Sequence, residues 1–308
     1  MKSNRIIPNP LKNGDVIGIA AVSGPVNPTN LKKGFEFVKA LGLKFKLGKN
    51  IYLSENYLAG SDEQRVESLN DFLLNPEIRG IIFARGGYGV MRILPQVNFD
   101  AMKSDPKIML GMSDLTALSI AAFQRCGLIT IAGPMLAGQI ADDLDNVTSD
   151  HLVRVLTQPL QQYDMVAGFQ SEIVGLRNGE TRGELLGGCL SLMVSLLGTP
   201  FSPNFSRSVL FIEEVNEPTY KIDRMLTQMK LAGVFDRVRG VIISHFSGNC
   251  SDEAQSDVEK IILEYTAASS VPVISRYPHG HELPNIPLPV GAEVEFMVSS
   301  QDIILRVI

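Results

Sequence analysis

The sequence predicts an α/β fold, with a doubly wound, mostly parallel sheet in the N-terminal domain and a strand-rich, mixed α/β C-terminal domain. Up to about residue 150, short apolar runs alternate with segments of helical spacing, which is typical of parallel strands covered by helices. After that point a polar, glycine-bearing stretch interrupts the alternation. We therefore expect one domain at 1–158, a linker region at 159–180 and a second domain at 181–308.

The elements of the first domain follow from apolar runs and helix signals. The run DVIGIAAVSG (15–24) is continuously apolar and closed by glycine, as expected of a buried parallel strand. The segment SDEQRVESLNDFLLN (61–75) predicts a helix, because Ser61 is a good N-cap and acids follow it. The other expected elements are helices at 27–42 and 114–127 and strands at 43–51, 79–85, 108–111 and 128–135.

The second half of the chain is read in the same way. The stretch at 163–188 is strand-like, without strand–helix alternation, and 292–308 is expected to form a terminal hairpin. The remaining expected elements are helices at 150–158, 187–200, 219–233 and 256–269, strands at 208–215 and 238–246, and a segment at 271–280 that opens the tail.

Composition narrows the class of protein. The 308 residues are 45% hydrophobic and 20% charged, which is ordinary for a globular enzyme and long enough to bury a sizeable core. The net charge is −5, and no basic patch stands out, so we expect no nucleic-acid partner. No apolar run reaches about 18 residues, so no membrane span is expected.

The cysteines and the N-terminus indicate the compartment. Cys126, Cys189 and Cys250 are odd in number, widely separated and without CxxC spacing. This pattern predicts reduced thiols in a cytoplasmic protein and no structural zinc site. The first fifteen residues, MKSNRIIPNPLKNGD, lack an apolar core, so we expect no secretory signal.

Four stretches at predicted strand ends carry chemical groups: ARGGYG, GMSD, LFIEEVNE and YPHGHELPN. Each one alone has an ordinary structural interpretation, as a tight turn, a helix cap or a solvated loop. Together they supply more. A serine on a strand-to-helix turn exposes its hydroxyl near backbone N–H groups that can hold an oxyanion. A histidine can deprotonate that serine, and a carboxylate can orient the histidine.

Spacing alone leaves two choices open. Glu213 and Glu214 are neighbours on a predicted strand, so they point to opposite faces and only one can reach a histidine. His279 and His281 are two residues apart and share a face if that segment is extended. His151 and His245 are expected in packing or loop roles.

The set of motifs resembles the LD-carboxypeptidase family of serine peptidases, which includes the microcin C self-immunity proteins. The resemblance runs in order across nearly the whole chain. Its pieces are GIAAVSGPV, ARGGYGVMRILPQVNFD, GMSDLTAL, GPML, GGCLSLMVSLLGTP, LFIEEVNEPTYKIDRMLTQMKLAGVF, GVIISHFSG and GHELPNIPLPVGAEVEF. The family's LPLG or LPIG is LPVG here, a mild apolar change.

The resemblance implies a catalytic triad of Ser113, Glu213 and His281, the last chosen over His279 by the Gly-His match. It also implies an oxyanion hole formed by the backbone N–H groups of Asp114 and of a glycine in RGGYG. Gly87 is preferred to Gly86 for that second donor.

Residues near the oxyanion loop are candidates for substrate binding. Arg85, Gly86 and Tyr88 lie in the same motif, and a guanidinium such as that of Arg85 can bind a substrate carboxylate through two parallel hydrogen bonds.

Three functions remain open from the sequence. The first is a cytoplasmic serine carboxypeptidase that removes the terminal D-alanine of a murein tetrapeptide during cell-wall recycling, without metal or organic cofactor, in a homodimer. The second is a microcin-immunity amidase that cleaves an aminoacyl-nucleotide analogue; the chain's lack of tryptophan weakens this reading, because a nucleobase favours aromatic stacking. The third is a binding module in which RGGYG and the helix start bind an anion and Ser113 only caps.

Overall fold

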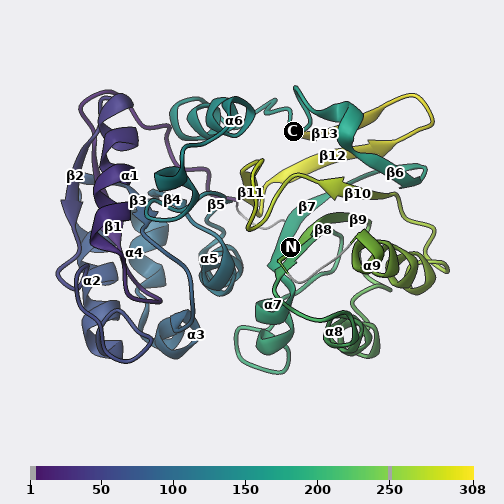
Figure 1. Ribbon diagram of the computed structural model, residues 1–308, viewed down its shortest axis with the longest axis horizontal. Coiled ribbons are helices and arrows are strands. Elements are labelled where there is room, and N and C mark those ends of the chain that lie inside the picture. The colour runs from purple at the N-terminus through teal and green to yellow at the C-terminus, as the bar shows by residue number, and fades with distance from the viewer. Residues whose placement is uncertain (1–4, 249–251) are drawn as a thin grey trace.

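The computed structural model describes residues 5–248 and 252–308. Two mixed sheets stand beside each other, each flanked by helices (Figure 1). The purple-to-blue N-terminal half of the chain builds most of one sheet, and the teal, green and yellow C-terminal half builds the other. The predicted α/β fold class is therefore confirmed.

The first sheet has the strand order β11-β5-β4-β3-β1-β2. Its strands are β1 (Val16–Ala20), β2 (Lys44–Leu47), β3 (Ile78–Phe83), β4 (Ile108–Leu110), β5 (Thr130–Ala132) and β11 (Leu288–Val290). The five N-terminal strands pair in parallel, whereas β11 runs antiparallel to β5. Parallel pairing places the carboxyl ends of β1, β3 and β4 at one edge, and the loops that carry the predicted motifs leave from there.

Helices cover this sheet. They are α1 (Pro28–Ala40), α2 (Asp62–Leu74), α3 (Val90–Ile93), α4 (Phe99–Ser104), α5 (Thr116–Cys126) and α6 (Asn146–Thr157), with 3₁₀ turns η1 (Leu94–Gln96), η2 (Ser113–Leu115) and η3 (Gln139–Asp142). Ser61 caps α2 in a reciprocal capping box with Gln64, as the Ser and the residue three positions later allow.

The second sheet has the order β13-β12-β7-β8-β9-β10-β6. Its strands are β6 (Val174–Arg177), β7 (Gly179–Cys189), β8 (Ser208–Val215), β9 (Gly240–Ser247), β10 (Val273–Tyr277), β12 (Glu293–Val298) and β13 (Ile303–Val307). Around it lie η4 (Gln170–Glu172), α7 (Leu190–Leu196), α8 (Thr219–Leu231) and α9 (Asp252–Tyr265). The central strands β7 to β10 are parallel, and the expected terminal hairpin is β12–β13.

Several boundaries differ from the sequence-based expectation. Helix α6 begins at Asn146 rather than at residue 150, because the side chain of Asp145 caps it. Residues 187–189 end strand β7 instead of opening the helix that follows. At Gly187 a Cβ atom would lie 1.9 Å from Phe211 O, so the strands approach closely where glycine alone fits.

Strand β11 crosses from the C-terminal part of the chain into the first sheet. The division of the chain into domains at 1–158 and 181–308, with a connection at 159–180, stays a prediction. None of the helices that the structure describes is both long and apolar enough to cross a membrane.

Candidate active site

The predicted nucleophile lies on a sharp turn between β4 and α5. Ser113 opens the 3₁₀ turn η2 with φ 62°, a left-handed conformation that is uncommon for a residue with a Cβ. A Cβ atom on Gly86 would lie 3.1 Å from Ser113 Oγ. The glycine therefore lets the backbone of the RGGYG loop approach the hydroxyl closely.

Two buried and opposite charges hold the loops around this turn. The Asp114 carboxylate accepts from Ser23 Oγ at 2.6 Å and from the Val90 N–H at 2.9 Å. The Arg65 guanidinium donates to Val22 O and to Gly89 O, the latter at 3.0 Å. Both side chains are fully buried. Asp114 therefore binds Ser23 and Val90, and Arg65 binds their neighbours Val22 and Gly89. Together the two side chains hold the loop after β1 against the RGGYG loop.

The electrostatics of Asp114 reflect this position. Burial raises the pKa of its carboxyl, and the hydrogen bonds from Ser23 and Val90 oppose that rise. The side chain belongs to the scaffold of the turn, while the Asp114 backbone N–H stands at the start of a helix, where N–H groups lack intrahelical partners.

Strand β8 places its two glutamates differently. Glu213, 1% exposed, directs Oε2 to His281 Nδ1 at 2.8 Å. Glu214 accepts from the Ser191 N–H at 2.7 Å, at the start of α7. Burial raises the pKa of Glu214 despite this hydrogen bond. Glu213 is therefore the acid that reaches a histidine.

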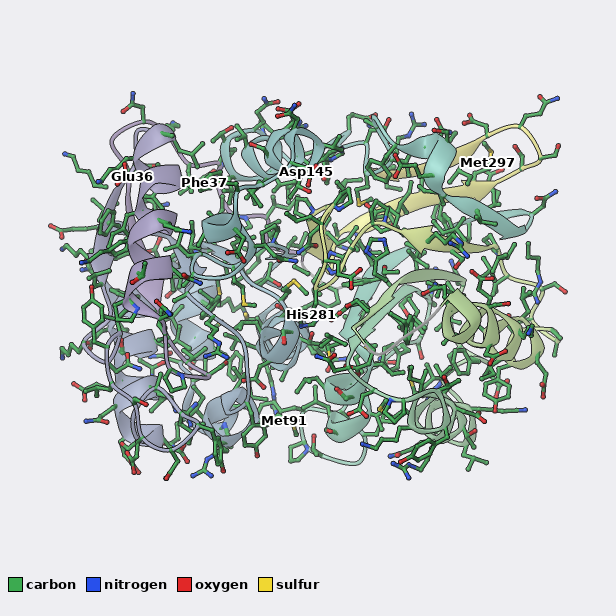
Figure 2. The ribbon with its side chains drawn as sticks, in the orientation of Figure 1. Glu36, Phe37, Met91, Asp145, His281 and Met297 are labelled. Carbon is green, nitrogen blue, oxygen red and sulfur yellow. The ribbon has the colours of Figure 1, made fainter. Side chains whose placement is uncertain are left out.

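The loop after β10 carries His281. Its label in Figure 2 lies between the two sheets. Burial alone would lower the pKa of the His281 imidazole, but the charge and the hydrogen bond of Glu213, with the charge of Glu214, outweigh burial and raise it. Because Nδ1–H donates to Glu213, Nε2 is the nitrogen left for another partner.

The other histidines take different positions. His279 is fully buried, donates from Nδ1 to Ile286 O at 2.9 Å and faces the Phe211 ring edge-on. Burial lowers the pKa of His279 to about 4. His151 bridges Tyr163 and Ala167 within the fold.

His245 is half-buried near the His281 loop. Its Cβ would lie 3.5 Å from a Cβ on Gly280, and its N–H donates to His279 O. Burial lowers the pKa of the His245 imidazole.

A chain of contacts joins the three predicted triad positions across the two sheets. Three residues after Ser113, the Thr116 hydroxyl accepts from the Cys189 N–H at 3.1 Å. Cys189 is the register partner of Glu213 on the adjacent strand, and Glu213 binds His281.

A second contact links the loop of His281 to the turn of Ser113. Four residues after His281, the Asn285 side chain donates to Sδ of Met112, next to Ser113, at 3.1 Å. Within the described residues, no hydrogen bond joins Ser113 Oγ to His281. Such contacts are often loose in a free enzyme and tighten with substrate.

The residues predicted to hold an oxyanion or a substrate surround the same turn. Gly87 has φ 117°, and its N–H makes no hydrogen bond to another described residue. Arg85 is exposed and donates to Pro25 O at 2.8 Å. Tyr88, 47% exposed, faces Tyr57 with ring centroids 6.0 Å apart.

Sequence reasoning missed three residues that shape the site: Arg65, Gln139 and Asn285. Arg65 had one signal, a charge on the otherwise apolar face of an amphipathic helix. Asn285 lies in the motif HGHELPN, but the motif did not indicate a role for it. Gln139 carried no local signal.

Among residues 5–248 and 252–308, no group of three His, Cys, Asp or Glu side chains is arranged to hold a metal ion. Cys126 and Cys189 are buried and unpaired, and burial raises the pKa of both thiols. Cys250 lies outside the described residues.

Comparisons with known proteins identify the family. Residues 17–133 match the LD-carboxypeptidase N-terminal domain, and residues 182–296 match the LD-carboxypeptidase C-terminal domain. A Bacillus subtilis protein named probable murein peptide carboxypeptidase is 33% identical, with 97% of this chain and 94% of the relative covered.

Two further relatives carry different names. The microcin C7 self-immunity protein of Escherichia coli is 26% identical, with 98% of this chain and 96% of the relative covered. The crystal structure of a muramoyltetrapeptide carboxypeptidase from Oxalobacter formigenes is 26% identical and superposes with a TM-score of 0.81, covering 95% of this chain and 98% of that one. The chain therefore belongs to the LD-carboxypeptidase family of serine-type peptidases.

Proposed function

We propose that this protein is a serine carboxypeptidase that removes the terminal D-alanine from a murein tetrapeptide, by a triad of Ser113, His281 and Glu213. The single observation that carries the proposal is the 2.8 Å hydrogen bond from His281 to the buried Glu213. The loop that carries His281 also contacts Met112, the residue before Ser113. The names of murein carboxypeptidases among the relatives support the substrate class.

In the proposed reaction, Ser113 Oγ attacks the carbonyl carbon of the bond between an L-centre and the terminal D-alanine. Nε2 of His281 takes the hydroxyl proton, and Glu213 stabilises the imidazolium that forms. The carbonyl oxygen becomes an oxyanion, to which the N–H groups of Gly87 and Asp114 donate; loss of one such donor typically costs about 100–1,000-fold in rate.

The intermediate then collapses. The carbon–nitrogen bond breaks, the proton on His281 passes to the leaving amine, and D-alanine departs. A water molecule, deprotonated by His281, hydrolyses the acyl group from Ser113 and restores the enzyme. The proposed chemistry needs no metal or organic cofactor, because every proton and charge is handled by these groups.

Substrate recognition is proposed for the surrounding loop. The terminal D-alanine carries a carboxylate, and the exposed guanidinium of Arg85 is the nearby cation that can pair with it. Gly86 leaves room beside Ser113, and Tyr88 offers an exposed aromatic face at the same loop.

The proposal is tested by replacing the nucleophile. Ser113→Ala should abolish release of D-alanine from a murein tetrapeptide and prevent labelling by a fluorophosphonate, while circular dichroism shows an unchanged fold. Labelling of the wild type distinguishes an enzyme from an anion-binding module in which Ser113 only caps. A Ser113→Ala protein that still releases D-alanine at the wild-type rate contradicts the assignment.

A microcin-type amidase is the second candidate, favoured by the self-immunity relative that covers nearly the whole chain. Its substrate would carry a nucleobase, and the chain has seven tyrosines but no tryptophan to stack on it. Measuring kcat/KM on a murein tetrapeptide and on an aminoacyl sulfamoyl-adenylate under the same conditions separates the two: the higher value names the substrate.

We also propose that the enzyme acts as a homodimer in the cytoplasm during cell-wall recycling, without a nucleic-acid partner. Buried, unpaired thiols at Cys126 and Cys189 suit a reducing compartment. Light scattering on the purified full-length chain gives the mass in solution, and a monomer at micromolar concentration would refute the dimer.

A further inference from the structure

Two side-chain amides bind both backbone groups of Gly280, the residue before His281. Gln139 Nε2 donates to Gly280 O at 2.9 Å, and the Gly280 N–H donates to Asn285 Oδ1 at 3.3 Å. Asn285 Nδ2 in turn donates to Gln139 Oε1 at 2.8 Å. The three residues therefore close a ring of hydrogen bonds that holds the C=O of the peptide leading into His281 and the N–H of the peptide before it.

The ring also reaches the nucleophile turn. The same Asn285 amide donates to Met112 Sδ at 3.1 Å, and Met112 precedes Ser113. The Asn285 backbone N–H donates to Thr148 Oγ1 at 2.9 Å. Gln139 and Thr148 belong to η3 and α6, which pack with the first sheet. The histidine loop is thus anchored on the half of the molecule that carries the serine.

The local backbone explains why such an anchor matters. Gly280 has φ 140°, a conformation available to glycine and rarely to other residues. A Cβ at this position would lie 3.4 Å from Glu213 Oε2. Glycine gives the chain this conformation, but it supplies no stiffness of its own. The orientation of the two peptides on either side of Gly280 therefore depends on what binds the Gly280 N–H and C=O groups.

The hydrogen bond to Glu213 does not fix the position of the His281 ring by itself. It fixes Nδ1 of His281, but one hydrogen bond at the end of the side chain does not by itself fix the distance from Nε2 to Ser113. Asn285 is fully buried, so its amide is shielded from competing water. Holding the backbone on one side and Nδ1 on the other defines where Nε2 points.

We propose that Gln139 and Asn285 are positioning residues, which hold the backbone of His281 at the distance from Ser113 that proton transfer requires. The proposal rests on the proposed function, since it assigns a role in the same triad. Misplacement of reacting groups by about 1 Å typically costs about 100-fold in rate.

The first test uses Gln139→Leu, which keeps the side-chain volume and removes both of its hydrogen bonds. Gln139 is only half-buried, so this variant is expected to fold. We expect kcat for D-alanine release to fall about 10- to 100-fold with KM changed less than threefold. The rate at which a fluorophosphonate labels Ser113 should fall by the same factor, because that reaction needs the same base but no peptide substrate.

Asn285→Ala, and the double variant that combines it with Gln139→Leu, measure the energetic coupling between the two side chains. If the two amides act as one device, the double variant should be no slower than the slower single variant. Asn70→Ala is the matched control: its amide also binds a backbone C=O and N–H, those of Gln96 and Asn98, in a loop away from the triad. This control should lose thermal stability without losing kcat.

Ser113→Ala separates the two levels of the proposal. If Ser113→Ala keeps the activity, the proposed function fails and the positioning role fails with it. If Ser113→Ala is inactive while folded Gln139→Leu keeps kcat and the labelling rate within twofold of the wild type, the positioning role is overturned and the triad stands. If Asn285→Ala does not fold, Gln139→Leu still decides between these outcomes.

Discussion

Replacement of Glu213 by glutamine removes one negative charge and preserves the shape of a side chain that is 1% exposed. In the proposed reaction His281 becomes an imidazolium, and Glu213 stabilises that charge. With about 4 Å between the centres of charge and an effective dielectric constant of about 20, Coulomb's law gives about 4 kcal/mol. That energy corresponds to a loss of about 10³-fold in kcat.

The same variant should move the pH dependence. Glu213 raises the pKa of His281 through its charge and its hydrogen bond. The base must be neutral to accept a proton, so activity is lost as the pH falls through that pKa. Without the carboxylate the pKa of His281 drops, and the acidic limb of kcat/KM should move to lower pH.

The assay is the release of D-alanine from a murein tetrapeptide, followed from pH 5 to pH 9. Glu214→Gln is the matched control, because this neighbour is also buried but binds the start of α7 and keeps an acceptor oxygen after substitution. It should keep kcat within tenfold. Folded Glu213→Gln protein with kcat within tenfold of the wild type would refute the reasoning.

Three more predictions concern the scaffold of the site. Arg65→Met should lower the free energy of unfolding by about 3 kcal/mol, because it leaves the Val22 and Gly89 carbonyl groups without their buried donor and breaks the ion pair with Asp62; urea unfolding measures this, and a loss below about 1 kcal/mol contradicts the role of Arg65 in holding the two loops together. For His279, the pKa of about 4 in the folded protein lies below the ordinary 6.5, so the unfolded chain binds more protons between those values. The contribution of this shift to the free energy of unfolding, on the order of 3 kcal/mol, is fully present above pH 6.5 and is lost as the pH falls towards about 4. His279→Asn should therefore flatten the curve of unfolding free energy against pH in that window, and an unchanged slope would contradict this role of His279. Gly187→Ala should destabilise the protein by about 3 kcal/mol, because its Cβ would overlap Phe211 O and push β7 from β8; a thermal melting temperature equal to that of the wild type would show that the strands can separate freely.

Local signals predicted much of the fold. A continuous apolar run closed by glycine predicted β1, because a strand buried on both faces has no polar side. Ser61 and the acids after it predicted the start of α2, because an N-cap side chain binds backbone N–H groups only two or three residues away. The alternation of Glu213 and Glu214 across a strand predicted that one acid alone would face a histidine.

Other features had no local signal. Strand β11 is three residues long with a central proline, Pro289, and its partner β5 lies far away in the chain. Helix α6 starts earlier than its apolar spacing suggested, because Asp145 supplies the cap. Such short elements take their structure from neighbours that are distant in sequence.

The sequence by itself determined the fold class, the family and the residue types at the strand ends, because these depend on periodicity, capping and motifs within a few residues. Only the tertiary structure decided that Glu213 binds His281 and that Gln139 and Asn285 meet around Gly280. The physical reason is one of range. Hydrogen bonds between side chains that are 68 and 146 residues apart depend on how distant strands and sheets pack, and no local pattern encodes that packing.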